Sequence, residues 1–267
     1  MNLPHNQAPK PPELSDQQFE RYARHLILEE VGEAGQAKLL ASSVLVVGAG
    51  GLGSPVLLYL AAAGVGRLGI VDDDRVELSN LQRQVLHGTA DLGRPKTESA
   101  AAALRRINPD IQVDRLERRL DAGNVETLIR PYDLVADGSD NFATRFIVAD
   151  ACYRLGKTLV SAALLRFDGQ LTTFKPHLGA PHPCLRCLYR DPPDDDAMPR
   201  CEQAGILGAL AGTMGALQAT EVLKELIGMG DSLSGALLLY DALGTTFRKV
   251  HIKRSPDCPL CGSEPGR

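Results

Sequence analysis

Short apolar runs alternate with helix-forming segments between residues 43 and 165, and this alternation limits the fold more than any other feature of the sequence. The runs SSVLVVG, RLGIVD, IQVDRL, YDLVADG and TLVSAAL have the length and composition of buried strands, and segments such as KTESAAAALRRI favour helices. Strands separated by helices form a parallel sheet with helices on both faces. We therefore predict an α/β fold with a doubly wound, mostly parallel, Rossmann-like sheet.

The pattern changes after residue 163. GQLTTFKP, LLLYDA and FRKVHIK indicate strands that extend the sheet in antiparallel fashion, and a helix is expected from about 207 to 228. Residues 176–200 form a long polar connection between them, and loops of this length are usually functional.

The N-terminal region predicts a capped helix. Ser15 is a suitable N-cap, and Gln18 completes a capping box. Helical spacing then places an apolar stripe on one face, made of Phe19, Tyr22, Ala23, Leu26 and Ile27.

Composition excludes several classes of function. The net charge is −4, from 29 basic and 33 acidic residues, and Trp is absent, so we expect no nucleic-acid partner and no anionic membrane surface. The 23 uncharged residues from Val44 to Gly66 contain six glycines and Pro55, which fits a strand, a glycine loop and a helix better than a membrane span. The first 14 residues lack the apolar stretch of a secretory signal. We expect a soluble, cytoplasmic protein.

A glycine-rich turn follows the first strand. Residues 48–53 match G-x-G-x-x-G, a pattern whose glycines let a phosphate approach the backbone at a helix N-terminus. Asp72 follows the second strand, 24 residues after Gly48, where a carboxylate can accept both ribose hydroxyls. These features predict a nucleotide site, against the alternative of a glycine turn with no ligand. They do not choose between NAD and ATP.

Two cations in the next segment argue against hydride transfer. Arg83 and Lys96 could reach a polyphosphate whose ribose lies at Asp72, and adenylyl transfer needs such charge on the leaving pyrophosphate. The alternative is that both are solvated surface charges. Asp140 follows the fourth strand and could hold Mg²⁺, unless it merely caps the helix that starts at Asn141.

The six cysteines fall into two groups. Two C-x₂-C pairs predict a tetrahedral structural zinc site, with disulfides as the alternative. Of the other two, Cys152 lies in an apolar helix and is expected in the core. Cys201, beside Arg200 and ahead of a helix, is either a reactive thiolate or a buried structural cysteine. We expect one Zn²⁺ per chain, held by Cys184, Cys187, Cys258 and Cys261.

Taken together, these residues resemble the bacterial adenylyltransferases related to the ubiquitin-activating enzymes. The resemblance covers residues 15–263 and rests on RYARHLIL, GAGGLGSP, VDDDRVELSNLQRQ, GRPK, SDN, CLRC, RCEQAG, YDA and CPLCG, in that order. It implies that the C-terminal glycine carboxylate of a small ubiquitin-like sulfur carrier ending in Gly-Gly attacks the α-phosphate of ATP. An acyl-adenylate and pyrophosphate are then formed.

The resemblance also implies roles for residues at matching positions. Arg83, Lys96 and Asp140 would act on the phosphates and Mg²⁺, Arg24 would reach the triphosphate of a second subunit in a homodimer, and Cys201 matches a cysteine whose role varies. The implied nucleotide-binding set is Gly48, Gly50, Gly51, Gly53, Asp72, Ser79, Asn80, Leu81, Gln82, Arg83, Lys96, Asp140 and Asn141.

The same resemblance suggests a domain plan and a branch. A disordered lead-in (1–14) would precede one domain (15–263), with a nucleotide-binding core (15–163) and a carrier-binding, zinc-tethered part (164–263). LSNLQRQVLH and MPRCEQAGILG are most similar to the branch that activates the molybdopterin synthase small subunit. The thiamin-pathway carrier is the near alternative, and an NAD-dependent oxidoreductase is the alternative from another class. Because the chain ends six residues after Cys261, we expect sulfur to arrive from a separate sulfurtransferase or cysteine desulfurase.

Overall fold

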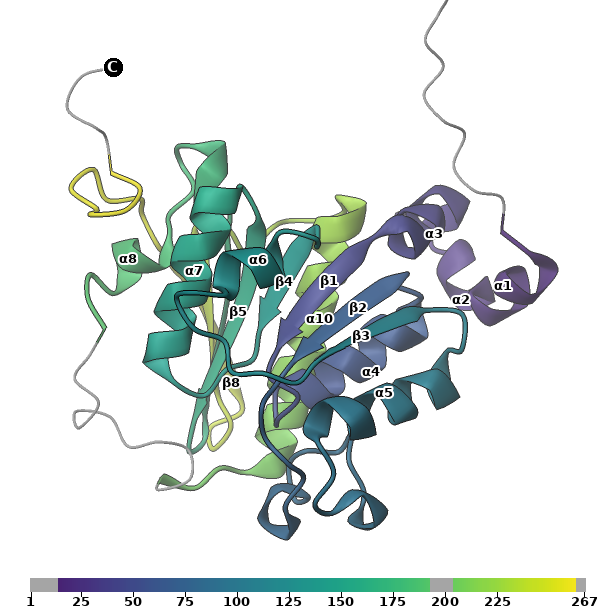
Figure 1. Cartoon of the computed structure of the whole chain (residues 1–267). Helices are drawn as coiled ribbons and strands as arrows, with labels where there is room; N and C mark the ends of the chain where they lie inside the picture. Colours follow the sequence, from purple (N-terminus) through teal and green to yellow (C-terminus); the bar gives the residue numbers. More distant parts are fainter. Residues whose placement is uncertain (1–13, 193–203, 263–267) are drawn as a thin grey trace, which may run out of the picture.

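The computed structural model describes residues 14–192 and 204–262, which form a mixed sheet of eight strands with helices on both faces of its parallel part (Figure 1). The strand order is β3-β2-β1-β4-β5-β6-β7-β8. The first five strands in this order are parallel, and β6 to β8 extend the sheet in antiparallel fashion. This confirms the predicted fold class. The strands are β1 (Ser43–Val47), β2 (Arg67–Val71), β3 (Gln112–Leu116), β4 (Leu134–Asp137), β5 (Thr158–Leu165), β6 (Asp168–Phe174), β7 (Ala236–Asp241) and β8 (Thr246–His251).

Helices cover the two faces because side chains of the parallel strands alternate between two cores. Val44 and Val46 of β1 lie in the core under α3, α4, α5 and α10, whereas Leu45 and Val47 lie in the core under α6 and α7. The α-helices are α1 (Asp16–Arg21), α2 (Ala23–Leu26), α3 (Gly32–Ala41), α4 (Gly53–Ala63), α5 (Lys96–Ile107), α6 (Val125–Ile129), α7 (Phe142–Leu155), α8 (Leu185–Leu188) and α10 (Gly208–Ile227). Three 3₁₀ turns add η1 (Leu78–Asn80), η2 (Thr89–Asp91) and η3 (Pro176–Leu178).

The N-terminal helix has the predicted cap but is not one continuous helix. Ser15 and Gln18 form the expected capping box. The chain breaks at Tyr22 into two short helices, α1 and α2, and Tyr22 inserts into the core, where its hydroxyl accepts a hydrogen bond from Asn108. The five apolar residues therefore do not form one packed face: Tyr22 is the one buried member, and Phe19 and Ile27 are 40% and 73% exposed.

The register of the central strands places their carboxyl ends at one edge. Val47, the last residue of β1, pairs with Val71 of β2 on one side and with Asp137 of β4 on the other. The connections from β1 and β4 leave the sheet in this place, and strand order reverses between them. In doubly wound sheets, ligands bind at such a switch point.

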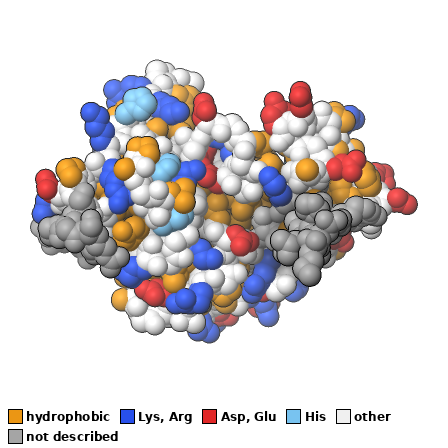
Figure 2. Space-filling view, turned by 90° about the horizontal axis from the view of Figure 1, so that it is seen from above, with side chains coloured by type: hydrophobic (Ala, Val, Ile, Leu, Met, Phe, Trp, Pro, Cys, Tyr) orange, Lys and Arg blue, Asp and Glu red, His pale blue; other side chains and the backbone are white. Residues whose placement is uncertain are grey.

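Charged side chains on the face shown in Figure 2 are interspersed, with basic, acidic and apolar groups next to one another. That face therefore carries no continuous basic field. Among the described residues, none of the helices combines the length and apolar character needed to cross a bilayer. The predicted lead-in, apart from Leu14, and Cys201 lie outside the described residues.

Candidate nucleotide site and cysteine cluster

The glycine loop connects β1 to α4 at the switch point. Gly48 has φ +88°, a left-handed conformation that favours glycine, and its N–H donates to Val71 O at 2.9 Å. A Cβ on Gly53 would lie 1.8 Å from Gly48 O, so the loop closes tightly on the first turn of α4. Gly50 and Gly51 are partly exposed, and their N–H groups have no acceptor in the described part of the chain. The loop thus offers free donors to an anion.

Asp72 is bound to this loop. Its Oδ2 accepts from Ala49 N at 2.7 Å, and its Oδ1 accepts from Asp74 N at 2.9 Å. Burial raises the pKa of Asp72, against the opposing effects of the Lys96 ammonium and of the two backbone donors. Each carboxylate oxygen keeps a lone pair for a further donor, such as a ribose hydroxyl.

Lys96 opens α5 and is buried, with only 5% of its surface exposed. Its Nζ forms an ion pair with Asp74 Oδ2 at 2.8 Å, whereas the Asp74 side chain is 67% exposed. The carboxylates of Asp72, Asp73 and Asp74 lie within 4.8 Å of one another. Lys96 is therefore not the solvated surface cation of the alternative interpretation.

Arg83 and its neighbours lie over the glycine loop. The side-chain carbons of Arg83 come within 3.7 Å of a Cβ built on Gly51, and its Nη1 donates to Ser79 O at 3.0 Å. Asn80 is buried, and its Oδ1 accepts from Glu77 N at 3.3 Å. Gln82 contacts the start of α10: a Cβ on Gly208 would lie 2.2 Å from Gln82 O. Leu81, between Asn80 and Gln82 in the sequence, is partly exposed.

The turn after β4 settles which residue caps α7. Asn141, not Asp140, is the N-cap, because Asn141 Oδ1 accepts from Thr144 N at 2.8 Å. Asp140 is exposed, and its one described contact is with the Asn141 amide at 3.3 Å. The capping role considered for Asp140 is therefore wrong, and its carboxylate has free lone pairs suited to Mg²⁺.

Arg24 lies away from the glycine loop of its own chain. It is exposed on α2, and the preceding α1 is held at the far end of α5, where Arg21 Nη1 donates to Ile107 O at 2.9 Å. Lys96 is at the opposite end of this 12-residue helix, about 18 Å away. The described residues of the predicted nucleotide-binding set thus lie near the carboxyl ends of β1, β2 and β4, whereas Arg24 lies near the opposite end of α5.

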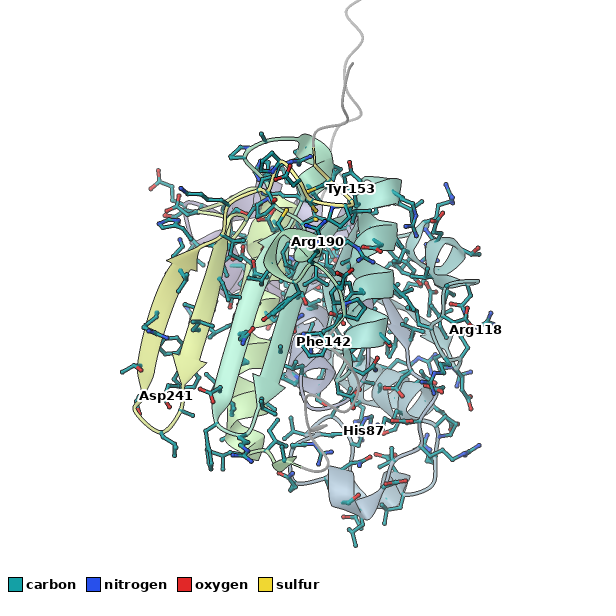
Figure 3. All side chains as sticks on the ribbon, turned by 90° about the vertical axis from the view of Figure 1, so that its left-hand side faces the viewer. His87, Arg118, Phe142, Tyr153, Arg190 and Asp241 are labelled. Carbon is teal, nitrogen blue, oxygen red and sulfur yellow. The ribbon has the colours of Figure 1, made fainter. Side chains whose placement is uncertain are left out.

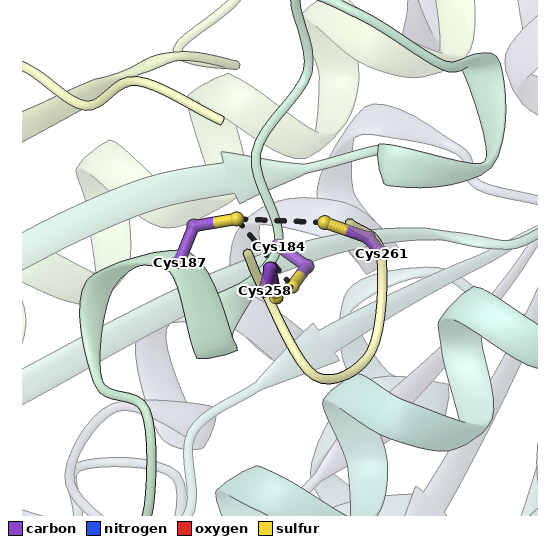
Figure 4. A group of neighbouring side chains, drawn as sticks. All are labelled: Cys184, Cys187, Cys258 and Cys261. Atoms are coloured by element: carbon purple, nitrogen blue, oxygen red, sulfur yellow. Dashed lines mark hydrogen bonds between the residues drawn. The ribbon is translucent and has the colours of Figure 1, made fainter. Parts of the chain in front are cut away.

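The four paired cysteines converge into one cluster (Figure 4). The Sγ separations are 3.8 Å between Cys184 and Cys187, 3.4 Å between Cys184 and Cys258, and 3.4 Å between Cys187 and Cys261. Thiolates around Zn²⁺ at about 2.3 Å would stand about 3.8 Å apart in a tetrahedron. None of the four is in a disulfide. The cluster fits structural zinc.

The cluster lies at the end of α7 remote from the nucleotide site. Tyr153, near the end of α7, packs against the cysteines, and Phe142 begins the same helix beside Asn141 (Figure 3). Fourteen residues of helix span about 20 Å. From α8, Arg186 holds Asp150 of α7 through two guanidinium nitrogens, Nε at 3.0 Å and Nη2 at 2.8 Å. A metal here braces α7 and cannot reach the phosphates.

Comparison with known proteins identifies the family. The family model described as "ThiF family" matches residues 22–260. The chain belongs to the ThiF family. It is 52% identical over 251 residues to "Sulfur carrier protein adenylyltransferase" of Thermus thermophilus (93% of each chain) and 51% identical over 245 residues to "SAMP-activating enzyme E1" of Haloferax volcanii (92% of this chain, 89% of the relative). These relatives confirm the prediction of an adenylyltransferase.

Two further comparisons concern longer chains. "Adenylyltransferase and sulfurtransferase MOCS3" of Bos taurus is 51% identical over 97% of this chain, which spans 57% of that protein's length. The crystal structure of E. coli MccB with ATP has a TM-score of 0.80 at 24% identity, covering 91% of this chain and 74% of that one. This last likeness concerns the fold alone.

Sequence patterns missed two buried polar residues around this site. His87 is buried against the glycine loop, and its Nε2 lies 2.9 Å from Ala49 O. Gln218 of α10 donates through Nε2 to Asp137 O and Val160 O, at 2.8 and 3.0 Å, and so supports the end of β4. No spacing rule signals such residues, because their partners are backbone groups far away in the chain.

His87 makes stability pH-dependent. Burial, reinforced by the Lys96 ammonium, lowers the pKa of His87 below its usual value of 6.5. The unfolded chain thus binds the extra proton first, and His87 contributes stability above pH 6.5 that is lost as the pH falls through its folded pKa. We expect the unfolding free energy of the wild type to fall towards that of His87→Gln between pH 7.5 and 5.5, measured by urea titration. A pH-independent difference would contradict this.

Proposed function

We propose that this chain transfers AMP from ATP to the C-terminal glycine of a small ubiquitin-like sulfur-carrier protein. The observation that carries the proposal is the buried Lys96 at the head of α5, next to the ribose-binding candidate Asp72. Dinucleotide binding needs no buried cation there, whereas a departing pyrophosphate does. The name of the Thermus relative, "Sulfur carrier protein adenylyltransferase", supports this activity, and the Haloferax relative is named an activating enzyme.

The reaction follows from the placement of these groups. Asp72 accepts the ribose hydroxyls, and the free N–H groups of the glycine loop receive the phosphates. The carrier carboxylate attacks the α-phosphorus, a new P–O bond forms, and the bond to the bridging oxygen breaks. Lys96 and Arg83 stabilise the charge that develops on pyrophosphate. Asp140 would hold Mg²⁺, which neutralises phosphate charge when bound.

An apolar rim beside this site suits the carrier. Phe167, Leu207 and Leu243 are 39%, 50% and 74% exposed. Their loops are joined by hydrogen bonds from Leu207 N to Arg166 O and from Ala242 N to Phe167 O. The rim adjoins the start of α10, where Ala211 approaches Gly51. This supports carrier binding by the 164–263 part, with the carrier tail directed at the glycine loop.

Within this class we propose the molybdopterin synthase small subunit as the carrier, and the thiamin-pathway carrier as the alternative. The proposal rests on LSNLQRQVLH and MPRCEQAGILG. To test this, both carriers are incubated in equimolar amounts with the enzyme, ATP and Mg²⁺, and the AMP adduct on each carrier is followed by intact-mass spectrometry. We expect the AMP adduct first on the molybdopterin-type carrier; earlier labelling of the thiamin-type carrier would reverse the assignment.

The exposed apolar surface near α2 supports a homodimer. His25 and Tyr59 line a groove of about 400 Å³ between α2, α4 and α10, with Ala216 and Leu223 on its other side. Ile27 beside it is 73% exposed. A second copy that covers this groove would bury Ile27, and we propose that Arg24 reaches the partner's triphosphate in such a dimer.

The shared site predicts complementation. Arg24→Ala and Asp140→Ala homodimers should each lose most pyrophosphate exchange, at least about 100-fold, because each active site lacks one group. Mixing them should restore up to about a quarter of wild-type activity, from heterodimers with one intact site. Exchange of subunits is verified with differently tagged chains. Absence of recovery after verified exchange would contradict the shared site.

A further inference from the structure

The peptide groups around Ala49 are held from two sides. Ala49 N–H donates to Asp72 Oδ2 at 2.7 Å, and Ala49 O lies 2.9 Å from His87 Nε2. Because a carbonyl oxygen only accepts, the hydrogen of this second bond must be on Nε2. In the neutral ring Nδ1 then carries a lone pair, and it faces Ser99 Oγ, 2.8 Å away, a hydroxyl that also lies beside the Asp91 carboxylate.

The bond to Ala49 O fixes the direction of the next N–H. In a trans peptide the carbonyl of Ala49 and the N–H of Gly50 point in opposite directions. His87 is buried (7% exposed) and holds the carbonyl from inside, so the Gly50 N–H is directed to the opposite, partly exposed side. That N–H has no acceptor among the described residues.

His87 also joins the loop to the helix that carries Lys96. Ser99 is buried in the first turn of α5, three residues after Lys96. His87 thus links α5 to the glycine loop through these two hydrogen bonds. We propose that His87 is a positioning residue for adenylyl transfer, which aims the Gly50 N–H at the nucleotide phosphates and keeps the loop in register with Lys96. The role of His87 in the reaction rests on the proposed function. Its role in nucleotide binding rests on the loop geometry alone.

Two amide variants separate the two bonds of the ring. In His87→Gln the side-chain amide reaches the position of Nε2 and can still donate to Ala49 O. In His87→Asn the shorter amide matches Nδ1 and reaches only Ser99. The matched control is His182→Asn, because His182 Nδ1 is likewise 2.8 Å from a serine hydroxyl, that of Ser234, away from the loop.

We measure ATP affinity by calorimetry, deuterium exchange of the peptide covering residues 48–53, and kcat of pyrophosphate exchange. For His87→Asn we expect about tenfold weaker ATP binding, faster loop exchange and a 10- to 100-fold lower kcat. His87→Gln should stay within about threefold of wild type. Ser99→Ala, which keeps the ring, should fall between them and replaces His87→Asn if that variant does not fold.

Several results would overturn the assignment. These are wild-type ATP affinity in His87→Asn, equal defects in the Gln and Asn variants, or the same losses in His182→Asn. If the wild type exchanges no pyrophosphate with any carrier, the proposed function fails, and ATP affinity and loop exchange still decide the role of His87.

Discussion

Lys96→Met should lower the rate of pyrophosphate exchange by about 100- to 1,000-fold, the usual loss when one preorganised charge donor is removed. Met is similar to Lys in size, so the substitution keeps the volume of this buried side chain and removes its charge. The Asp72, Asp73 and Asp74 carboxylates would then lack their buried cation, and the pKa of Asp72, already raised by burial, would rise further. ATP affinity should therefore fall as well.

The matched control is Lys175→Met. Lys175 is also largely buried, and it pairs with Glu225 at 2.8 Å, remote from the glycine loop. Its loss should reduce thermal stability without changing kcat more than about twofold. If Lys96→Met and wild type both bind carrier and exchange pyrophosphate at equal rates, Lys96 has no role in the reaction.

Cys258→Ser should lower zinc content and melting temperature together. Four thiolates would fill the coordination shell of a zinc ion, so we expect a structural metal whose binding is coupled to local folding. A loss of about 3 kcal/mol lowers the melting temperature of a chain of this size by about 6 to 12 °C. Nucleotide affinity should change far less, because the cluster and the glycine loop lie at opposite ends of α7.

Cys152→Ala is the control for this second prediction, since Cys152 is buried outside the cluster. It should keep one zinc per chain by metal analysis. Full zinc retention in a Cys184→Ser/Cys258→Ser double variant, or no zinc in wild type purified without chelator, would contradict the site.

The strands were predictable because β1, β2, β4 and β5 are short, nearly continuous apolar runs, the pattern of parallel strands that helices cover on both faces. The N-terminal stripe was not, because helical spacing shows which side chains share a face but not what covers it. Phe19 and Ile27 stay exposed since the chain turns at Tyr22.

Part of the candidate site was predictable from the sequence, and part was visible only in the folded chain. Glycines, charged residues and paired cysteines have spacings tied to phosphate or metal chemistry, so the sequence could propose Gly48, Asp72 and the zinc cluster. His87 acts on a carbonyl 38 residues away, and that contact exists only after folding. The choice between Asp140 and Asn141 as cap also needed coordinates, since both are good N-cap residues.

The most direct test of the central claim is ATP–pyrophosphate exchange with the purified chain, in the presence and absence of Mg²⁺ and of a sulfur carrier ending in Gly-Gly. Formation of an acyl-adenylate is reversible while the intermediate stays bound, so labelled pyrophosphate should return to ATP. We predict exchange that requires both Mg²⁺ and the carrier, and that is lost when the terminal glycine is removed. Tight binding of NAD, with no exchange for any such carrier, would contradict the account.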